Sequence, residues 1–336
     1  MKVKEMRKLA ENIEKGKIRT LKSKDEFQFK CTACGKCCFN NDVMVNIYDL
    51  VRLRNAVRLP TQELMKRKLV NFYLGSSSGL PILAINFQKA GDKATRCPFL
   101  ASAIHFKELE KRLKIKGKNK EQIEQLLKEH RKNPDKIHKY LEGIKIDRWL
   151  CAVHKQRPII CRLFPLGRIK RLDRDGKLEK ETFILQKKTD WCPGWKEKHK
   201  YTLKSFLDEC DFWHFKEGSD KSYSVLERLL SSGFFAATKD NKNAKIKPKF
   251  EESSPVLKFL GNLIYNFDSI NYFSKDERVV KTISGDVSHE DFMYVVEKVG
   301  KIVDFFIKSY MTSKDEGNLQ GLEQFMNKVN PKGGEK

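Results

Sequence analysis

The densest feature of this sequence is a run of four cysteines within eight residues, Cys31-Thr-Ala-Cys34-Gly-Lys-Cys37-Cys38. A spacing of three residues can turn the sulfurs of Cys31, Cys34 and Cys37 toward one centre, and Gly35 gives the backbone the freedom to wrap around it. Thiols gathered this closely are too reactive to serve only as core filler. The run therefore predicts a metal site.

Four further cysteines lie in contexts that suit a ligand: Cys97, Cys151, Cys161 and Cys192. Bacterial ferredoxins hold a [4Fe–4S] cluster with C-x2-C-x2-C and a remote Cys-Pro, and the remote candidates here are Cys97-Pro98 and Cys192-Pro193. Four thiolates suit zinc equally well. The eight thiols would fit two four-ligand sites or one cluster with accessory thiols, and the spacing leaves the pairing open.

Other residues near these segments are interpreted differently. Cys38 adjoins Cys37, so we expect it to face a second centre or the same polynuclear centre from another side. Cys210 lies in the amphipathic stretch DECDFWHF and is expected to be a packed thiol inside a helix. His154 and His214 are weaker ligand candidates.

The chain is strongly basic, because 68 Lys and Arg against 44 Asp and Glu give a formal net charge of +24 over 336 residues. Such a charge can attract nucleic acid, an anionic membrane surface or an acidic protein, although no block of basic residues interleaved with aromatics stands out. A solvated basic surface that only keeps the protein soluble is the equal alternative. There is no run of about 18 apolar residues to span a membrane, and the first residues lack the apolar block of a secretory signal. We therefore expect a cytoplasmic protein with reduced cysteines.

Several enzyme motifs are missing from the sequence. No glycine-rich phosphate loop follows a predicted strand, and His-Glu-x-x-His does not occur. The C-x3-C-x2-C spacing of radical S-adenosylmethionine enzymes is absent as well. If this chain is an enzyme, its metal centre must carry the chemistry.

The sequence pattern predicts an α+β fold, mainly α-helical, in which a cysteine-rich metal-binding core carries a small β-hairpin and an inserted helical arm. We expect a basic N-terminal helix over residues 1–24, a cysteine-cluster metal-binding domain over 25–200 and a helical region over 201–312, followed by a flexible tail over 313–336. The arm spans 105–147, where strong helix formers and sparse apolar positions predict a projecting element.

Local signals predict the individual elements. Residues 166–172 and 178–185 flank Asp173-Arg174-Asp175-Gly176, which is a strong hairpin signal. Residues 81–87 are short, apolar and branched, and predict a strand. Helices are expected over residues 47–57 with Asn46 as N-cap, and over 62–73, 202–216, 221–231, 255–267 and 289–312.

Taken in order, CTACGKCC, CPFL, CAVHKQRPIICRLFP and CPGW resemble the YkgJ-type cysteine-cluster family, a zinc- or iron-chelating CxxCxxCC domain. The resemblance covers about residues 31–195, skips the arm, and does not extend beyond about residue 201. One branch with a similar cysteine region is the flagellin lysine methylase, which is implied to use an iron–sulfur cluster and S-adenosylmethionine.

The resemblance implies eight metal ligands or neighbouring thiols and two arginines beside them. The thiols are those of Cys31, Cys34, Cys37, Cys38, Cys97, Cys151, Cys161 and Cys192. Arg157 and Arg162 flank Cys161, where they can donate hydrogen bonds to cluster sulfurs or bind a cofactor carboxylate or phosphate. A structural salt bridge is the equal alternative for the arginines.

Three functions follow as expectations. The first is a cytoplasmic protein with a [4Fe–4S] cluster, in its sharpest form an S-adenosylmethionine-dependent enzyme resembling protein lysine methyltransferases. The second is a zinc-stabilised binding module whose basic surface engages nucleic acid or an acidic protein. Metal storage or delivery is a third, weaker expectation.

Overall fold

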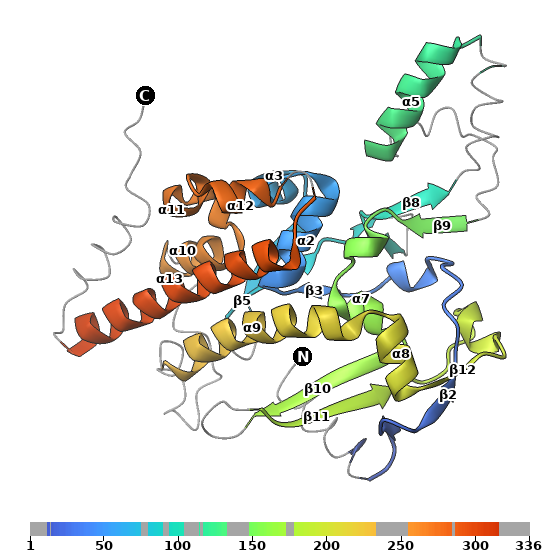
Figure 1. Ribbon diagram of the computed structural model, residues 1–336, viewed down its shortest axis with the longest axis horizontal. Helices are drawn as coiled ribbons and strands as arrows, with labels where there is room; N and C mark the ends of the chain where they lie inside the picture. The colour runs from blue at the N-terminus through green and yellow to red at the C-terminus, as the bar shows by residue number, and fades with distance from the viewer. Residues whose placement is uncertain are drawn as a thin grey trace.

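Helices and short antiparallel strands are combined in an α+β fold (Figure 1). The structure is a computed structural model that describes residues 12–13, 15–74, 80–89, 94–103, 114, 117–132, 148–172, 178–232, 255–283 and 286–315. Over these ranges, none of the helices has both the length and the apolar character that crossing a membrane requires.

Among the described residues, the strands form five small antiparallel sheets. One three-stranded sheet contains the predicted hairpin of β10 (Leu166–Leu172) and β11 (Leu178–Leu185), with β1 (Thr20–Leu21) at its edge. The other has the order β3-β5-β4 and contains β3 (Met44–Val45), β5 (Pro81–Ile85) and β4 (Val70–Leu74). Three strand pairs complete the set: β2 (Glu26–Gln28) with β12 (Lys200–Thr202), β6 (Gln88–Lys89) with β7 (Thr95–Arg96), and β8 (Leu100–Ala103) with β9 (Arg148–Cys151).

Three helices form the main helical layer, namely α2 (Ile47–Val57), α9 (Phe212–Ser231) and α13 (His289–Asp315), and α10 (Pro255–Tyr265) packs against β5. The other α-helices are α3 (Thr61–Lys66), α5 (Lys120–Lys132), α7 (Ile159–Leu163), α8 (Leu203–Glu209), α11 (Asn271–Ser274) and α12 (Glu277–Lys281). Short 3-10 turns occur at η1 (Lys36–Cys38), η3 (His154–Gln156), η4 (Pro193–Lys196) and η6 (Phe267–Ser269).

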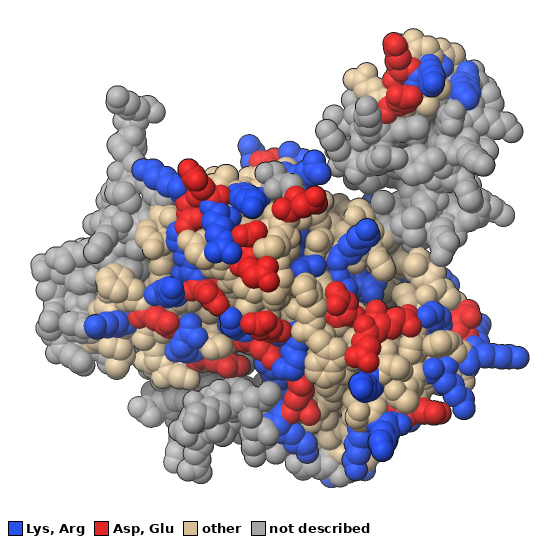
Figure 2. All heavy atoms as spheres, viewed as in Figure 1, with Lys and Arg blue, Asp and Glu red and all other residues tan. Residues whose placement is uncertain are grey.

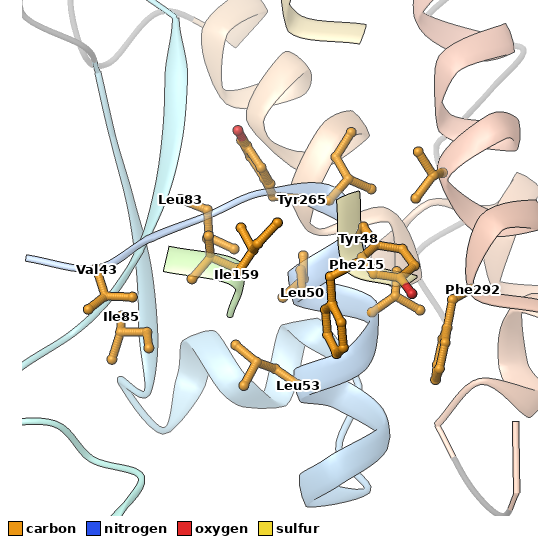
Figure 3. Packing of buried hydrophobic residues seen from close by; sticks show 14 of the residues in the cluster. Val43, Tyr48, Leu50, Leu53, Leu83, Ile85, Ile159, Phe215, Tyr265 and Phe292 are labelled. Carbon is orange, nitrogen blue, oxygen red and sulfur yellow. The ribbon is translucent and has the colours of Figure 1, made fainter. Parts of the chain in front are cut away.

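Helix α2 lies at the centre of the core. Its N-cap is Asn46, as predicted, and the Asn46 side chain accepts a hydrogen bond from the Asp49 amide at 2.8 Å. Figure 3 shows apolar side chains of α2 facing residues of α7, α9 and α13, including Tyr48, Leu50, Leu53, Ile159, Phe215 and Phe292. The core therefore combines residues of the predicted cysteine-cluster domain (25–200) with residues of the predicted helical region (201–312).

The close approach of α2 and α9 depends on small residues. A methyl group at Gly218 would lie 2.2 Å from the Tyr48 ring. One turn later, Ser222 Oγ accepts a hydrogen bond from the Tyr48 amide at 3.0 Å, and Ser219 Oγ accepts one from the Asn46 side chain at 3.2 Å. These small side chains let the two helix backbones meet without a gap.

The structure corrects two helix predictions. The helix expected over 62–73 ends at Lys66, and residues 70–74 form β4 because they pair with β5. The helices expected over 202–216 and 221–231 have a different boundary in the structure. The first, α8, ends at Glu209, and the chain turns at Asp211, whose φ is 58°. The second, α9, begins at Phe212 and runs unbroken to Ser231. Cys210 therefore lies at the C-cap of α8, outside a helix interior.

The predicted N-terminal helix, arm and tail lie largely outside the described residues. Residues 12–13 are helical, but Thr20–Leu21 form β1, so the helix does not reach residue 24. In the arm, α5 stands apart from the other described elements beyond the paired strands β8 and β9 (Figure 1). The helix expected over 255–267 is present as α10, which ends at Tyr265 before the turn η6, and the helix expected over 289–312 is present as α13, which continues to Asp315 into the predicted tail.

Candidate metal centre

The loop that carries the first four cysteines is tightly wound. Ala33, Gly35 and Asn40 have positive φ angles of 53°, 72° and 50°. Glycine adopts this conformation without steric cost, so the backbone at Gly35 has the freedom that was predicted for it, whereas a metal centre for the loop to wrap around stays a prediction. Turn η1 follows it directly and contains both Cys37 and Cys38. All nine cysteines are free thiols, and Cys31 is exposed whereas Cys34, Cys37 and Cys38 are partly buried.

Backbone contacts join this loop to the segment that carries Cys97. The Cys97 amide donates a hydrogen bond to the Cys38 carbonyl at 2.9 Å. The Asn40 amide donates to the Thr95 carbonyl at 2.9 Å, and the Thr95 amide donates to Asn40 Oδ1 at 2.7 Å. Two segments that are distant in sequence are therefore held side by side.

Strand pairing then brings in the third cysteine segment. Leu100 of β8 pairs with Cys151 of β9. The Ala152 amide donates to the Phe99 carbonyl at 2.8 Å. The pair closes the base of the arm, so Cys97 and Cys151 are close in space although the arm separates them in sequence.

Cys161 lies on helix α7, which is anchored from two directions. The Ile159 amide donates a hydrogen bond to Asp49 Oδ1 of α2 at 3.1 Å. Arg162 donates to the carbonyls of Arg157 and Cys210, both at 3.3 Å, and to that of Lys155. These bonds fix α7 against α2 and against the segment that carries Cys151.

Cys192 precedes turn η4, which packs against the start of the cysteine loop. The Lys30 amide donates to the Gly194 carbonyl at 3.0 Å, and a methyl group at Gly194 would lie 2.6 Å from the Lys30 carbonyl oxygen. The rings of Phe29 and Trp195 meet edge to face at 5.2 Å. This packing places Cys192 next to the chain that leads into Cys31.

The thiols are close enough to change one another's ionisation. Burial raises the pKa of Cys161 far above its usual range, and the thiols of Cys97, Cys151 and Cys37 raise it further. Burial also raises the pKa of Cys97 to about 12 and that of Cys151. A hydrogen bond from Cys38 lowers the pKa of Cys37 to about 7. A bound cation would offset the cost of ionising the buried thiols.

The donor set suits a soft metal, because thiolates favour zinc and iron–sulfur clusters. Within the described parts of the chain, no group of three or more His, Cys, Asp and Glu side chains is arranged to hold a metal ion.

The two predicted arginines occupy different positions. Arg162 is buried, and its guanidinium stacks on the Phe215 ring at 3.6 Å while it donates to backbone carbonyls. Burial lowers its pKa to about 10. Arg157 hydrogen-bonds His154 Nε2, and its charge opposes the effect of burial on the pKa of Cys151. Arg162 thus fixes the fold around α7, whereas the charge of Arg157 acts on the thiols of Cys37 and Cys151.

Two buried polar residues were not singled out by the sequence analysis. Asp49 is 1% exposed, and burial raises its pKa to about 7. Arg52, one turn later on α2, stacks on Phe215 at 3.9 Å. Both lie in the stretch DLVRLR, whose polar positions look like an exposed helix face, so no local signal reveals their burial.

The ninth cysteine is Cys210. Cys210 is buried, its thiol donates to the Leu207 carbonyl at 3.5 Å, and its role as a packed thiol stays a prediction.

On the face shown in Figure 2, described Lys and Arg side chains are interspersed with Asp and Glu. On that face, the positive charge forms no single patch among the described residues.

Comparison with known proteins yielded no relatives: no family model, curated protein or solved structure matches this chain. The resemblance to the YkgJ-type family therefore rests on the cysteine segments, their order and their local contexts.

Proposed function

We propose that this protein binds a metal through its clustered cysteines, as a [4Fe–4S] iron–sulfur cluster in a reducing cytoplasm. The observation that carries the proposal is the convergence of free thiols from separate stretches of the chain. Backbone hydrogen bonds hold Cys97 beside Cys38, and strand pairing adds Cys151. Buried thiols that raise one another's pKa gain most from a cation that stabilises their thiolate forms.

Iron–sulfur ligation is preferred over zinc because of the C-x2-C-x2-C run with a distant Cys-Pro. A bound cluster would supply a redox-active or Lewis-acid centre. Zinc takes the same donors and is the alternative metal. The proposed ligands are Cys31, Cys34, Cys37, Cys38, Cys97, Cys151, Cys161 and Cys192.

In its sharpest form, the proposal is an enzyme that resembles the flagellin lysine methylase and transfers a methyl group from S-adenosylmethionine to a protein lysine. The likeness of the cysteine segments supports this form. The charge of Arg157 near Cys37 and Cys151 also supports it, because a cation there favours an anionic cluster or a cofactor carboxylate. Arg162 is proposed to position this segment.

The competing proposal is a zinc-stabilised module that engages nucleic acid or an acidic protein. Its support is the net charge of +24. The mixed charges on the face in Figure 2 give it no further support, so we rank it second.

Purification without oxygen, followed by iron, zinc and sulfide analysis, tests the proposal. We expect a brown protein that contains iron and acid-labile sulfide in similar amounts, and Cys210→Ser should keep both. Zinc without sulfide would promote the competing proposal. A chain that carries neither metal would refute both metal-based functions.

A further inference from the structure

The first residue of α13, His289, completes a buried hydrogen-bond chain that begins on α2. Arg52 Nη1 donates to the Tyr48 hydroxyl at 3.0 Å, and this hydroxyl lies 2.8 Å from His289 Nδ1. Tyr48 is fully buried, Arg52 is 6% exposed and the His289 side chain is 20% exposed. The chain therefore ties the start of α13 to the interior of the core.

The direction of this chain requires a neutral His289. Because an arginine guanidinium can only donate, the Tyr48 oxygen accepts from Arg52 and its own proton needs an acceptor. Among the described residues, His289 Nδ1 is the acceptor within hydrogen-bond distance. A histidine nitrogen accepts only when it carries no proton. The ring proton therefore lies on Nε2, which faces Glu217 Oε2 of α9 at 3.5 Å.

Protonation of His289 would break the chain. Nδ1 would become a donor, and the Tyr48 hydroxyl would lose its acceptor, which is costly for a buried group. A second cation would also approach the Tyr48 oxygen beside Arg52. In addition, His289 is the first residue of α13, where the helix macrodipole disfavours a positive charge.

A second histidine faces the first. The ring centroid of His214 on α9 lies 4.4 Å from that of His289, so two protonated rings would repel each other. Partial desolvation lowers the pKa of His214, and the charge of His289 lowers it further. Arg52 and Arg162 act in the same direction, whereas Asp211 opposes the shift. The arrangement therefore favours two neutral rings.

The acidic groups on α9 and α2 compensate little for a charge on these rings. Glu217 is 59% exposed, and Lys221 lies 3.3 Å from its other carboxylate oxygen. Asp211 is exposed at the start of α9. Asp49 of α2 is buried, and burial raises its pKa to about 7, so it is mostly protonated in mild acid. Solvent, a neighbouring cation or a proton therefore weakens each of these negative charges.

The acidic groups at the start of α13 have partners or solvent of their own. Asp291 accepts from Arg278 of α12 at 2.7 Å, and Lys281 lies 4.0 Å from its other oxygen. The Ser288 hydroxyl also donates to Asp291 at 3.1 Å. Glu290 is exposed, so solvent screens its charge. These contacts join α12 to α13 and do not involve the buried hydroxyl.

We propose that His289 and His214 form an acid-sensitive switch, in which protonation releases the first turn of α13 from α2 and α9. The rest of α13 stays in place, because its buried residues from Val295 to Phe306 are apolar and do not titrate. The released turn frays and admits water, which then accepts from the Tyr48 hydroxyl. The switch uses none of the proposed cysteine ligands, so it is independent of the proposed metal binding.

Hydrogen–deuterium exchange of the full-length protein, followed by mass spectrometry, tests the switch. The amides of residues 292–295 close the first turn of α13. Their exchange is compared at about pH 7.5 and about pH 5.5, after correction for the intrinsic effect of pH. We expect exchange about tenfold faster in acid for each histidine that must stay neutral, because a released histidine titrates near about pH 6.5. Asp49 cannot cause this loss, because its raised pKa makes the fold more stable as the pH falls.

His289→Gln identifies the group responsible. The glutamine amide oxygen accepts from the Tyr48 hydroxyl as the imidazole does, but the amide does not ionise. This variant should therefore show the same corrected exchange at both pH values. His214→Gln should lose part of the acid effect, because it removes the repulsion between the rings. His199→Gln changes an exposed histidine that packs on Tyr201 of β12, and this matched control should behave like the native protein.

Equal protection of the first turn of α13 in the native protein at both pH values would overturn the proposal. An acid effect in His289→Gln as large as the native one would also overturn it, because the titrating group would then lie elsewhere. If His289→Gln does not fold, His214→Gln decides: a smaller acid effect than in the native protein supports the switch, and an undiminished one excludes it. Faster exchange in acid that spreads equally over α10 and α13 would indicate global unfolding and refute a local switch.

Discussion

The amide of Cys97 donates a hydrogen bond to the carbonyl of Cys38 at 2.9 Å, which joins two cysteine segments that are far apart in sequence. A β-bridge between Phe39 and Arg96 and the contacts of Asn40 extend this junction. The bonds involve backbone atoms, so they gather the thiols independently of any metal. The segments of Cys38 and Cys97 are therefore held together by the fold itself.

Asn40→Ala should weaken this junction. The change leaves the Thr95 amide without its side-chain acceptor and places alanine at a φ of 50°. We expect a loss of about 1–3 kcal/mol in the free energy of unfolding of the metal-free protein, measured with urea. Asn71→Ala, at an exposed position of β4, is the control and should stay within about 0.5 kcal/mol. Equal stability of the two variants would contradict the structural role of Asn40.

Gly218→Ala should destabilise the contact between α2 and α9. The added methyl group would lie 2.2 Å from the buried Tyr48 ring, which cannot move without displacing the core. We expect a loss of about 1–3 kcal/mol or more in thermal or urea unfolding. Gly300→Ala is the matched helical control, because its nearest neighbour is the flexible end of Arg228 at 3.0 Å. A Gly218 variant as stable as the Gly300 variant would refute this packing.

The buried carboxyl of Asp49 should make stability depend on pH. Its pKa is raised by burial to about 7 in the folded protein, compared with about 3.9 when unfolded. Between these values the folded state keeps a proton that the unfolded chain has released, so stability falls as pH rises from about 4 to about 7.

Asp49→Asn should remove that dependence, because the amide keeps an acceptor oxygen for the Ile159 amide and does not ionise. Relative to the native protein, the metal-free variant should gain up to about 4 kcal/mol between pH 4 and pH 7, measured by urea unfolding. A stability difference between the two proteins that does not change with pH would exclude a titrating Asp49.

Replacement of residues 108–142 by a short linker should preserve the metal site. Strands β8 and β9 pair at the base of the arm, from Leu100 with Cys151 to Ala103 with Arg148, and this pairing does not require the residues beyond it. The shortened protein should keep the native metal content per chain, measured after anaerobic purification. Metal-free aggregate would show that the arm belongs to the core.

Nucleic-acid binding, if it occurs, should be weak, independent of sequence and steeply dependent on salt. Each phosphate neutralised by a basic side chain releases counterions, so six contacts lose roughly a thousandfold in affinity between about 50 and about 200 mM salt. Fluorescence anisotropy with unrelated DNA and RNA probes measures this. Tight binding to one sequence or structure that survives at high salt would promote the zinc-stabilised module over the iron–sulfur protein.

Local sequence patterns were sufficient to predict the features that depend only on residues close together in the sequence. The winding of the loop at Gly35, the cap at Asn46 and the hairpin of β10 and β11 all follow from such short-range signals. The helix at 289–312 was predictable because its apolar residues recur on one face, which packs against α9 and α2.

Only the tertiary structure decided the features that depend on distant partners. Residues 70–74 form a strand because β5 pairs with them, and position 218 of α9 needs glycine because Tyr48 of α2 occupies the space where a side chain would lie. The sequence by itself determined which cysteines are candidate ligands. Which of them meet was decided by hydrogen bonds between remote segments, such as Cys38 with Cys97 and Lys30 with Gly194, because no local pattern specifies a partner far along the chain.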